Sequence, residues 1–415
     1  MKRTVNSFVF AAVLVTLFAC GKDDNGKKYA KQYVYPPDGT DWAMVAPEKH
    51  NFDSDLLEKA RDYMATTHVT AAMFIVGGEC ILQYGPIASD FTYMASCRKS
   101  VLAMLYGKYI ENGTVNPRLT MEDLGITDVV EEGKTANGVS LKDYPDGLTP
   151  QEKTATIQHL ITARSGVYHD ASNEGSSAGT IVRDTYKPGE HYLYNNWDFN
   201  VAGFVLEKLV KGKENPSDRN NKAFYQILQA DLAQPIGMAD WDIGRQKFAG
   251  NSSLSIYPAY HIYITTRDMC RIAYLMLRKG KWNGKQVISE SWVKEITSPQ
   301  STLQEVGPDG YFSYGYMWWL FDKHSKYFTG VYDGAYMACG SHGQYMLVLP
   351  KLDLVAAWKT RTTRVEDGKT VENSTNRTNF LKTLDYVIKA YKGEIQYKES
   401  SGDDIIDDDA ENDFI

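Results

Sequence analysis

The chain has 415 residues, of which 43% are apolar and 23% charged, a composition typical of a globular protein of one or two domains. Its formal net charge of −7 is unevenly distributed, because residues 399–415 hold eight acidic side chains and no basic one. The remainder is close to neutral and has no basic stripe, which excludes the usual signature of a nucleic-acid-binding protein. We expect residues 396–415 to form a solvated, disordered acidic tail.

The N-terminal residues have the pattern of a secretion signal. Two basic residues precede an apolar stretch over residues 8–18, which is too short to span a bilayer. The sequence Leu-Phe-Ala-Cys that follows, at 17–20, resembles the lipobox of bacterial lipoproteins, in which the cysteine is lipidated and becomes the mature N-terminus. We therefore predict a signal peptide over 1–19 and a lipid anchor at Cys20. The alternative is a cleaved soluble protein in which this cysteine occurs by chance.

The segment from residue 20 to 45 is polar, with several lysines and a Pro-Pro pair, and we expect a tether that lifts the body from the membrane. Within it, Lys-Asp-Asp at 22–24 is similar to the signal that directs some Gram-negative lipoproteins to the cell surface. The predicted location is therefore the cell envelope, at the outer membrane or on the cell surface.

Four further cysteines have wide and irregular spacing: Cys80, Cys97, Cys270 and Cys339. Export permits disulfides, but this spacing favours buried free thiols. The sequence has no Cys-x-x-Cys, His-x-x-x-His or His-Glu-x-x-His pattern, so we predict neither a metal site nor a cofactor.

Apolar spacing predicts the secondary structure at both ends of the chain. The expected elements are a helix from Ser54 to Met64, strands over 71–76, 80–84, 345–349 and 354–358, and a final helix over 375–391. In the middle, helices are expected over 157–164 and 199–210. This order predicts an α/β (α+β) fold, in which one antiparallel sheet from both termini is flanked by helices. A mostly helical insertion at about 115–245 would form a cleft with it.

The first chemical motif is Ser96-Cys97-Arg98-Lys99, at the start of a stretch with helical apolar spacing that Gly113 is expected to end. Three residues apart, Ser96 and Lys99 would lie on the same face of the helix. The N–H groups and the dipole at a helix N-terminus would favour an oxyanion there. Lysine has a pKa of about 10.4, and lowering it to near neutrality requires roughly 4 kcal/mol, so Lys99 can act as a base only if it is buried.

This spacing alone is not specific, because Ser291 and Lys294 repeat it. Tyr194-Asn195-Asn196 distinguishes the two copies, since this Tyr-x-Asn follows Ser96 but precedes Ser291. Residues 175–179 match the Gly-x-Ser-x-Gly elbow of α/β-hydrolases. That elbow requires a preceding strand, whereas the preceding residues here are polar and loop-like, so we interpret this match as chance.

Together, these motifs resemble the serine β-lactamase and penicillin-recognising superfamily, specifically its class C-like branch of esterases, peptidases and amide hydrolases. Segments that resemble this branch, including its nylon-oligomer hydrolases, extend the likeness over about 47–392: residues 155–166, 267–269, 280–282, 314–319 and 340–344. The resemblance implies that Ser96 is the nucleophile and that Lys99 helps to deprotonate it. It also implies that Tyr194 carries the proton to the leaving group and then activates water, while Asn196 hydrogen-bonds the substrate or Lys99.

The third element of the family, Lys/His-Thr/Ser-Gly on a strand beside the cleft, is missing. Counting back from Pro350 places it near 335–338, where the sequence is Ala-Tyr-Met-Ala, and Lys359-Thr360-Arg361 comes after the last strand. We expect the backbone N–H of Ala338 or Cys339 to be the second oxyanion donor. The loss of the family's cation argues against β-lactam hydrolysis.

Two further residues are candidates for the edge of the cleft. His342 would partly replace the missing cation, unless it is an ordinary residue of the hairpin. Tyr168 would contact the substrate from the lid loop. Metal and nucleic acid are not expected as partners; the expected partners are a small acyl substrate and, through the anchor, the membrane.

Three functions remain open for the predicted domain over 46–395. The first is hydrolysis of an ester, amide or small-peptide bond through a Ser96 acyl-enzyme. The second is a penicillin-binding-like or ligand-binding module of the same fold with little or no turnover. The third is a surface protein that retains the site without using it.

Overall fold

The computed structural model describes residues 16–22, 28–129, 143–173, 181–307, 310–328, 330–366 and 368–394. Its longer strands are β1 (Thr16–Lys22), β2 (Lys28–Tyr33), β3 (Ala71–Val76), β4 (Glu79–Tyr84), β13 (Tyr336–Gly340), β14 (Gln344–Leu349), β15 (Leu354–Lys359), β16 (Thr363–Glu366) and β17 (Lys369–Glu372). Its short strands are β5 (Thr92–Tyr93), β6 (Lys247–Ala249), β7 (Ala259–His261), β8 (Tyr263–Ile264), β9 (Lys281–Trp282), β10 (Lys285–Gln286), β11 (Phe312–Tyr314) and β12 (Trp319–Phe321). Its α-helices are α1 (Ser54–Thr66), α2 (Cys97–Glu111), α3 (Ile157–Ile161), α4 (Asn196–Lys211), α5 (Ala223–Leu228), α6 (Thr266–Leu277), α7 (Glu290–Ile296), α8 (Leu303–Val306) and α9 (Arg377–Ala390).

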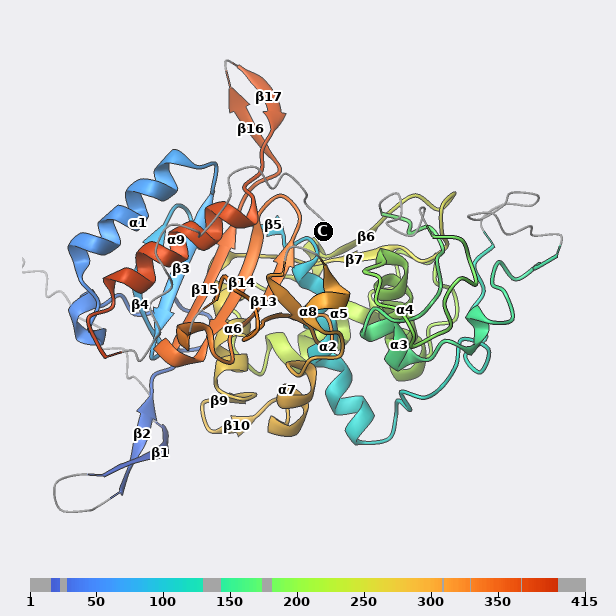
Figure 1. The fold of residues 1–415 in the computed structure, drawn as a ribbon, viewed down its shortest axis with the longest axis horizontal. Helices are drawn as coiled ribbons and strands as arrows, with labels where there is room; N and C mark the ends of the chain where they lie inside the picture. The colour runs from blue at the N-terminus through green and yellow to red at the C-terminus, as the bar shows by residue number, and fades with distance from the viewer. Residues whose placement is uncertain are drawn as a thin grey trace, which may run out of the picture.

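Seven strands form one antiparallel sheet in the order β11-β12-β13-β14-β15-β3-β4. The N-terminal part of the chain supplies β3 and β4, and β3 pairs with β15 from the C-terminal part (Figure 1). The predicted fold, a sheet built from both ends of the chain and flanked by helices, is thereby confirmed. Strands β3, β13, β14 and β15 are buried along their whole length, because other elements cover both faces of the sheet.

Local sequence signals set several element ends. Gly77 and Gly78 have φ of +63° and +96°, in the left-handed region that glycine tolerates, and they form the predicted turn between β3 and β4. At the start of α1, Asp53 accepts a hydrogen bond from the N–H of Leu56. The predicted helix start at Ser54 is therefore explained by a capping side chain.

Two helices of the middle region have bounds that differ from the predicted ones. Helix α4 begins at Asn196 rather than at residue 199, because the side chain of Asn195 caps it by accepting from the N–H of Trp197. Helix α3 ends at Ile161 rather than at residue 164, since Ala163 has φ of +58°, which a helix cannot accommodate.

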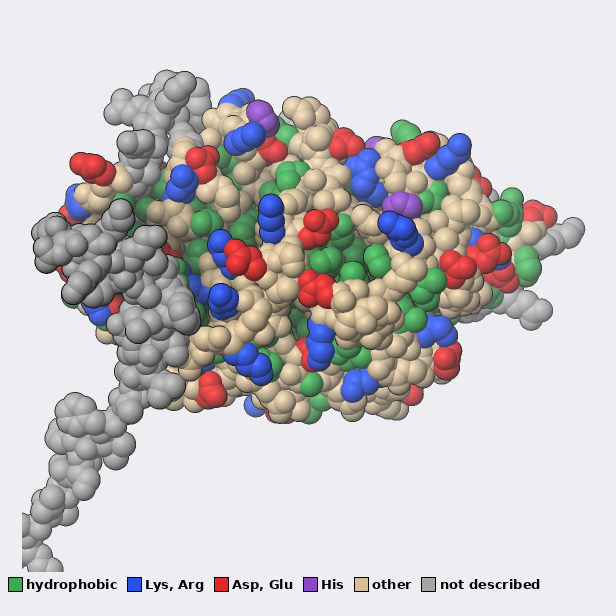
Figure 2. All heavy atoms as spheres, turned by 90° about the horizontal axis from the view of Figure 1, so that it is seen from below, with side chains coloured by type: hydrophobic (Ala, Val, Ile, Leu, Met, Phe, Trp, Pro, Cys, Tyr) green, Lys and Arg blue, Asp and Glu red, His purple; other side chains and the backbone are tan. Residues whose placement is uncertain are grey.

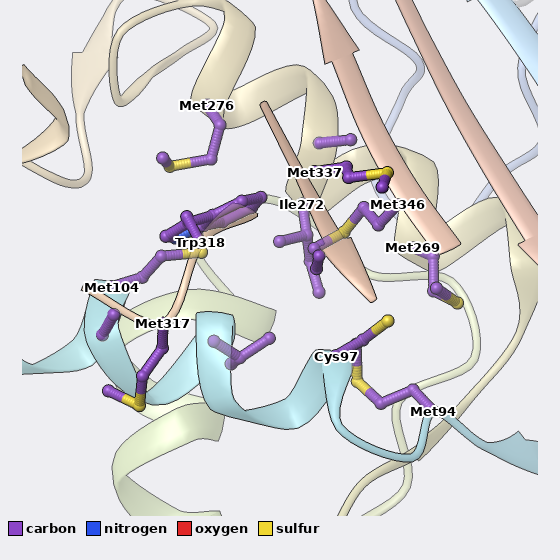
Figure 3. Close-up of a cluster of buried hydrophobic side chains, with 14 of the residues drawn as sticks. Met94, Cys97, Met104, Met269, Ile272, Met276, Met317, Trp318, Met337 and Met346 are labelled. Carbon is purple, nitrogen blue, oxygen red and sulfur yellow. The ribbon is translucent and has the colours of Figure 1, made fainter. Parts of the chain in front are cut away.

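The side chains of β14 show how the two faces of the sheet are covered. Neighbouring residues of a strand point to opposite faces. The ring of Tyr345 stacks on Phe380 of α9 with centroids 4.9 Å apart, whereas Met346 points into a buried, methionine-rich cluster between the sheet, α2 and α6 (Figure 3). Flexible methionine side chains fill such irregular spaces well. Helices α1 and α9 therefore pack on one face, and α2 and α6 on the other.

The predicted insertion contains α3, α4 and α5, which lie beside α2 (Figure 1). Helix α4 packs against α2, α3 and α5. A buried ion pair holds the loops of this region, since Arg183 Nε lies 2.7 Å from Glu152 Oε1. Arg183 also donates to the carbonyl of Gly147 at 2.8 Å. These contacts hold the loops around residues 147, 152 and 183 together.

The predicted tether over residues 20–45 includes residues that are packed in the domain. Strands β1 and β2 form a hairpin that projects from the body (Figure 1), but Tyr35 and Trp42 are buried. Their rings contact Tyr274 of α6 at centroid distances of 5.5 and 5.4 Å. The N–H of Cys80 donates to the carbonyl of Ala43 at 2.8 Å. The packed domain therefore begins at about residue 35 rather than at residue 46.

Residues 1–15 of the predicted signal peptide lie outside the described residues, as does the predicted acidic tail over 396–415. Within the described ranges, no helix is both long and apolar enough to cross a membrane. The face shown in Figure 2 carries interspersed Lys, Arg, Asp and Glu side chains around an apolar recess. This face therefore has no large area of a single charge.

Candidate active site

The predicted nucleophile, Ser96, lies half-buried at the N-terminus of α2, where the chain turns sharply. Ala95 has φ of +46°, which is uncommon for a residue with a Cβ. The end of β13 passes behind this turn so closely that a Cβ on Gly340 would lie 3.0 Å from the Ser96 nitrogen. The thiol of Cys97 donates to the carbonyl of Gln344 at 3.2 Å. These contacts fix Ser96 against the β13–β14 hairpin.

Lys99 brings the predicted catalytic residues together. Its side chain is buried, and its Nζ lies 2.9 Å from Ser96 Oγ and 2.5 Å from Asn196 Oδ1. The same Nζ contacts the hydroxyl of Tyr194. The rings of Tyr194 and Phe199 cover the amine at centroid distances of 4.1 and 4.8 Å. A potential proton acceptor therefore lies within hydrogen-bond reach of the serine hydroxyl.

The Tyr-x-Asn segment is held in place from the loop that follows α3. The side-chain amide of Asn195 donates to the carbonyls of Val167 and His169, at 3.1 Å in each case. Because Asn195 also caps α4, this residue fixes its two neighbours, Tyr194 and Asn196.

Aromatic rings orient Tyr194 from both sides. Its ring centroid lies 4.9 Å from that of Phe199 and 5.8 Å from that of Trp319 on β12. The neighbouring Trp318 instead lies in the buried cluster between the sheet, α2 and α6 (Figure 3). Trp319 therefore belongs to the surroundings of the site, whereas Trp318 belongs to the core.

A cavity of about 350 Å³ opens beside Ser96. Its polar and aromatic lining includes Arg98, Asn173, Lys247, His261, Tyr263 and Ser341. None of these was predicted as a site residue. Arg98 could have been found, because it lies inside the Ser-x-x-Lys motif. Lys247 and His261 could not, because they lie on the short strands β6 and β7, which carry no recognisable motif.

The predicted oxyanion donors Ala338 and Cys339 are buried within β13, and neither lines this cavity. The strand position beside Ser96 belongs to Gly340, and the next residue, Ser341, lines the cavity. The count back from Pro350 therefore gave a position a few residues too early. It did so because the turn between β13 and β14 has only three residues.

The predicted position of the family's third element is far from the nucleophile. Ala335 and Tyr336 line a separate cavity of about 740 Å³ at the other end of β13. The residues beside Ser96, over 339–341, are Cys-Gly-Ser and carry no cation.

Three other residues lie away from the cavity. Tyr168 is buried at 2% exposure, and burial raises the pKa of its hydroxyl. His342 has φ of +60° in the β13–β14 turn, and its Nδ1 lies 3.6 Å from Glu372 Oε1. The alternative nucleophile Ser291 is exposed, with its hydroxyl 3.2 Å from Glu111 Oε1. None of these three residues lines the cavity beside Ser96.

The four cysteines after Cys20 are free and buried, as predicted. Burial raises the pKa of the Cys97 and Cys339 thiols, which disfavours reactive thiolates beside the site. Among the residues that the structure describes, no group of His, Cys, Asp and Glu side chains could hold a metal ion. The Gly-x-Ser-x-Gly match at 175–179 lies outside the described residues.

Comparison with known proteins identifies the family of this chain. The profile of the family described as Beta-lactamase matches residues 59–374. The chain belongs to the beta-lactamase family. The predicted membership of the serine β-lactamase-related superfamily is thus confirmed.

Two relatives in this family align over much of the chain. An uncharacterised protein of Alkalihalophilus pseudofirmus is 30% identical over 243 residues, which cover 55% of this chain and 66% of that protein. The 6-aminohexanoate-dimer hydrolase of Paenarthrobacter ureafaciens is 23% identical over 326 residues, which cover 72% of this chain and 75% of that protein. The second relative is a hydrolase by name.

Solved structures of the beta-lactamase family share the fold. A Bacillus anthracis protein with the provisional name 6-aminohexanoate-dimer hydrolase has a TM-score of 0.57 at 16% identity, covering 86% of this chain and 88% of that one. A class C beta-lactamase has a TM-score of 0.52 at 12% identity, covering 82% and 97%. At these identities the likeness shows the fold alone.

Lys359 was expected after the last strand, but it is the final residue of β15. Its side chain contacts the segment that precedes Ser96. Its buried ammonium donates to the carbonyl of Thr92 at 2.7 Å and also to that of Ile264. These carbonyls belong to β5 and β8, and β5 leads directly into Ser96. Lys359 therefore positions the strand that precedes the nucleophile and takes no part in the cavity.

We expect Lys359 to make the stability of the protein depend on pH. Burial lowers its pKa to about 7, whereas lysine in the unfolded chain has a pKa of about 10.4. Between these values the unfolded chain binds the extra proton, so the free energy of unfolding rises with pH by up to about 1.4 kcal/mol per pH unit. Urea unfolding of wild type and Lys359→Met between about pH 7 and pH 9 should show a growing advantage for wild type. A difference that does not change with pH would contradict this assignment.

Proposed function

We propose that this chain is a serine hydrolase that cleaves ester or amide bonds through an acyl-enzyme on Ser96. The observation that carries the proposal is the set of contacts around Lys99. One buried amine lies within hydrogen-bond reach of Ser96 Oγ, the Tyr194 hydroxyl and Asn196 Oδ1. Ser291 has no such surroundings, because its hydroxyl is exposed and contacts Glu111.

In the first half of the reaction, Ser96 Oγ attacks the carbonyl carbon of the substrate and its proton passes to Lys99 Nζ, 2.9 Å away. The burial of Lys99 favours the uncharged amine that can accept this proton. The proton then passes through the Tyr194 hydroxyl to the leaving alcohol or amine as the bond to the carbonyl carbon breaks. The acyl group remains as an ester on Ser96.

In the second half, water attacks this ester and gives up its proton through Tyr194, which releases the acid and restores the serine. The oxyanion of both steps accepts from the backbone N–H groups of Ser96 and Ser341. Two observations support Ser341 in place of Ala338 or Cys339. Gly340 lies against the backbone of Ser96, and Ser341 lines the same cavity as Ser96.

The substrate class is a small ester, amide or peptide rather than a β-lactam. A Lys/His-Thr/Ser-Gly element that ended at Gly340 would cover residues 338–340, which are Ala-Cys-Gly and carry no cation. One relative is named for hydrolysis of the 6-aminohexanoate dimer, which supports an amide or a related small acyl compound.

The test is intact-mass analysis of the protein after reaction with a fluorophosphonate, together with steady-state turnover of an activated ester. We expect one adduct per chain in wild type and in Ser291→Ala, and no adduct and no turnover in Ser96→Ala. Ser291→Ala is the matched control because it removes the serine of the second Ser-x-x-Lys. An adduct that persists in Ser96→Ala would refute Ser96 as the nucleophile.

We further propose that the chain is exported and anchored through a lipid on Cys20. The support is the apolar stretch over 8–18 followed by Leu-Phe-Ala-Cys. Metabolic labelling with a fatty-acid analogue should label wild type and leave Cys20→Ser unlabelled, with Cys20→Ser recovered in the soluble fraction. Equal labelling of both proteins, or no label on wild type, would overturn the lipid anchor.

A further inference from the structure

The cavity beside Ser96 has a pronounced charge asymmetry. Arg98 and Lys247 line it, and no Asp or Glu is among its described lining residues. Neither cation forms an ion pair with a carboxylate within the part of the chain that the structure describes: Arg98 contacts neutral groups, and Lys247 lies over the ring of Tyr263 at 5.2 Å. The described lining of the cavity is therefore positively charged and holds no carboxylate.

Arg98 is held rigidly in this wall. Its residue is 2% exposed, its Nη2 donates to Asn200 Oδ1 at 2.8 Å, and its guanidinium lies 4.2 Å from the ring centroid of Tyr260. Asn200 donates in turn to Asn173 Oδ1 at 2.8 Å, which extends the network to the cavity lining. The Nη1 of Arg98 is buried and has no hydrogen-bond partner among the residues that the structure describes. A buried charge without a counter-charge is costly, so its presence in this wall needs a reason beyond stability.

His261 lies close to the same two positive charges. His261 is directly opposite Lys247 in the β6–β7 pair, so both side chains point to one face. Burial, together with the neighbouring charges of Arg98 and Lys247, lowers the pKa of His261 to about 3. The imidazole is therefore neutral at physiological pH, and its buried Nδ1 has no hydrogen-bond partner within the described part of the chain. It contributes a polar surface to the cavity without cancelling any charge.

Aromatic rings form the remaining side of the cavity. Tyr93 and Tyr263 are opposite one another in the β5–β8 pair, with ring centroids 6.2 Å apart. The ring of Tyr93 also lies 5.2 Å from that of His261. The cavity thus combines an aromatic wall, suited to the apolar body of a ligand, with a positively charged one.

We propose that this cavity selects substrates that carry a carboxylate, with Lys247 contacting the carboxylate and Arg98 supplying a fixed positive charge from the wall. The inference rests on the proposed hydrolase function and names its substrate class. Lysine and arginine side chains bind carboxylates through their ammonium and guanidinium groups. These cations lie on β6 and α2, away from the end of β13 where the family's cation would stand.

The test compares activated esters that differ in one charge. The carboxylate is placed either on the acyl group, as in the 4-nitrophenyl hemiester of glutaric acid against 4-nitrophenyl valerate, or on the leaving phenol. In at least one pair, we expect the kcat/KM of wild type to be about tenfold higher for the charged ester than for the neutral ester. Lys247→Glu should lower this ratio by about tenfold or more. The preference should also weaken as salt is added.

Lys285→Glu, on the exposed strand β10, is the matched control and should keep the wild-type preference. A wild type without preference in either pair, or a preference unchanged in Lys247→Glu, would overturn the proposal. Binding to Ser96→Ala separates this result from a failure of the hydrolase proposal. Calorimetry of Ser96→Ala should show that it binds the charged ester about tenfold more tightly than the neutral ester. This result does not depend on whether wild type hydrolyses the ester. Equal affinities would reject carboxylate selection.

Discussion

Replacing Lys99 by methionine is expected to lower kcat/KM for an activated ester by about 10³-fold, because the general base next to Ser96 Oγ is lost. Methionine is similar in length, so the buried space between the rings of Tyr194 and Phe199 should stay filled. We therefore expect the variant to fold. Steady-state ester hydrolysis measures the activity, and thermal unfolding checks the fold.

The second Ser-x-x-Lys supplies the matched control. Lys294→Met removes an exposed lysine at the same spacing from Ser291, and it should leave both activity and stability near wild type. If Lys99→Met were folded and retained activity within about tenfold of wild type, Lys99 would not be the general base.

Replacing Tyr194 by phenylalanine is expected to slow release of the acyl group more than its formation. The ring and its contacts with Phe199 and Trp319 remain, while the hydroxyl that contacts Lys99 is lost. We expect kcat to fall by about 10²-fold to 10³-fold, with a burst of one product per chain and an acyl-enzyme visible by mass. Stopped-flow measurement of the released phenol gives both phases.

Tyr314→Phe is the control, because its ring lies 6.2 Å from that of Tyr194 and the proposed mechanism gives its hydroxyl no role. It should turn over ester at close to the wild-type rate. Unchanged kcat in Tyr194→Phe would remove Tyr194 from the mechanism. A wild type that forms a stable adduct without turnover would instead favour the ligand-binding alternative.

Much of this protein could be predicted because its signals are local. The strand over Ala71–Val76 has the predicted bounds, since an apolar run followed by two glycines specifies both a buried strand and its turn. The serine, tyrosine and asparagine that meet the Lys99 amine were also named from the sequence, because Ser-x-x-Lys on a helix and Tyr-x-Asn before a helix are short patterns with fixed order.

The errors came from quantities that depend on distant parts of the chain. The strand position beside Ser96 was misplaced because the length of the β13–β14 turn is not evident from its residues. Tyr35 and Trp42 were assigned to a tether, although their burial depends on α6, more than two hundred residues later. Tyr168 was expected at the cleft, but it is not among the residues that line the cavity beside Ser96.

By itself, the sequence determined the kind of fold, the order of its elements and the identity of the serine, lysine, tyrosine and asparagine that meet in the site. Tertiary structure alone decided which backbone stands behind Ser96 and which charges surround its cavity. Lys247 and His261 reach the cavity because β6 and β7 pair beside α2, and nothing within either three-residue strand specifies that neighbour. Electric charge acts across space, so the sign of a cavity is set by residues that the fold brings together from distant parts of the chain.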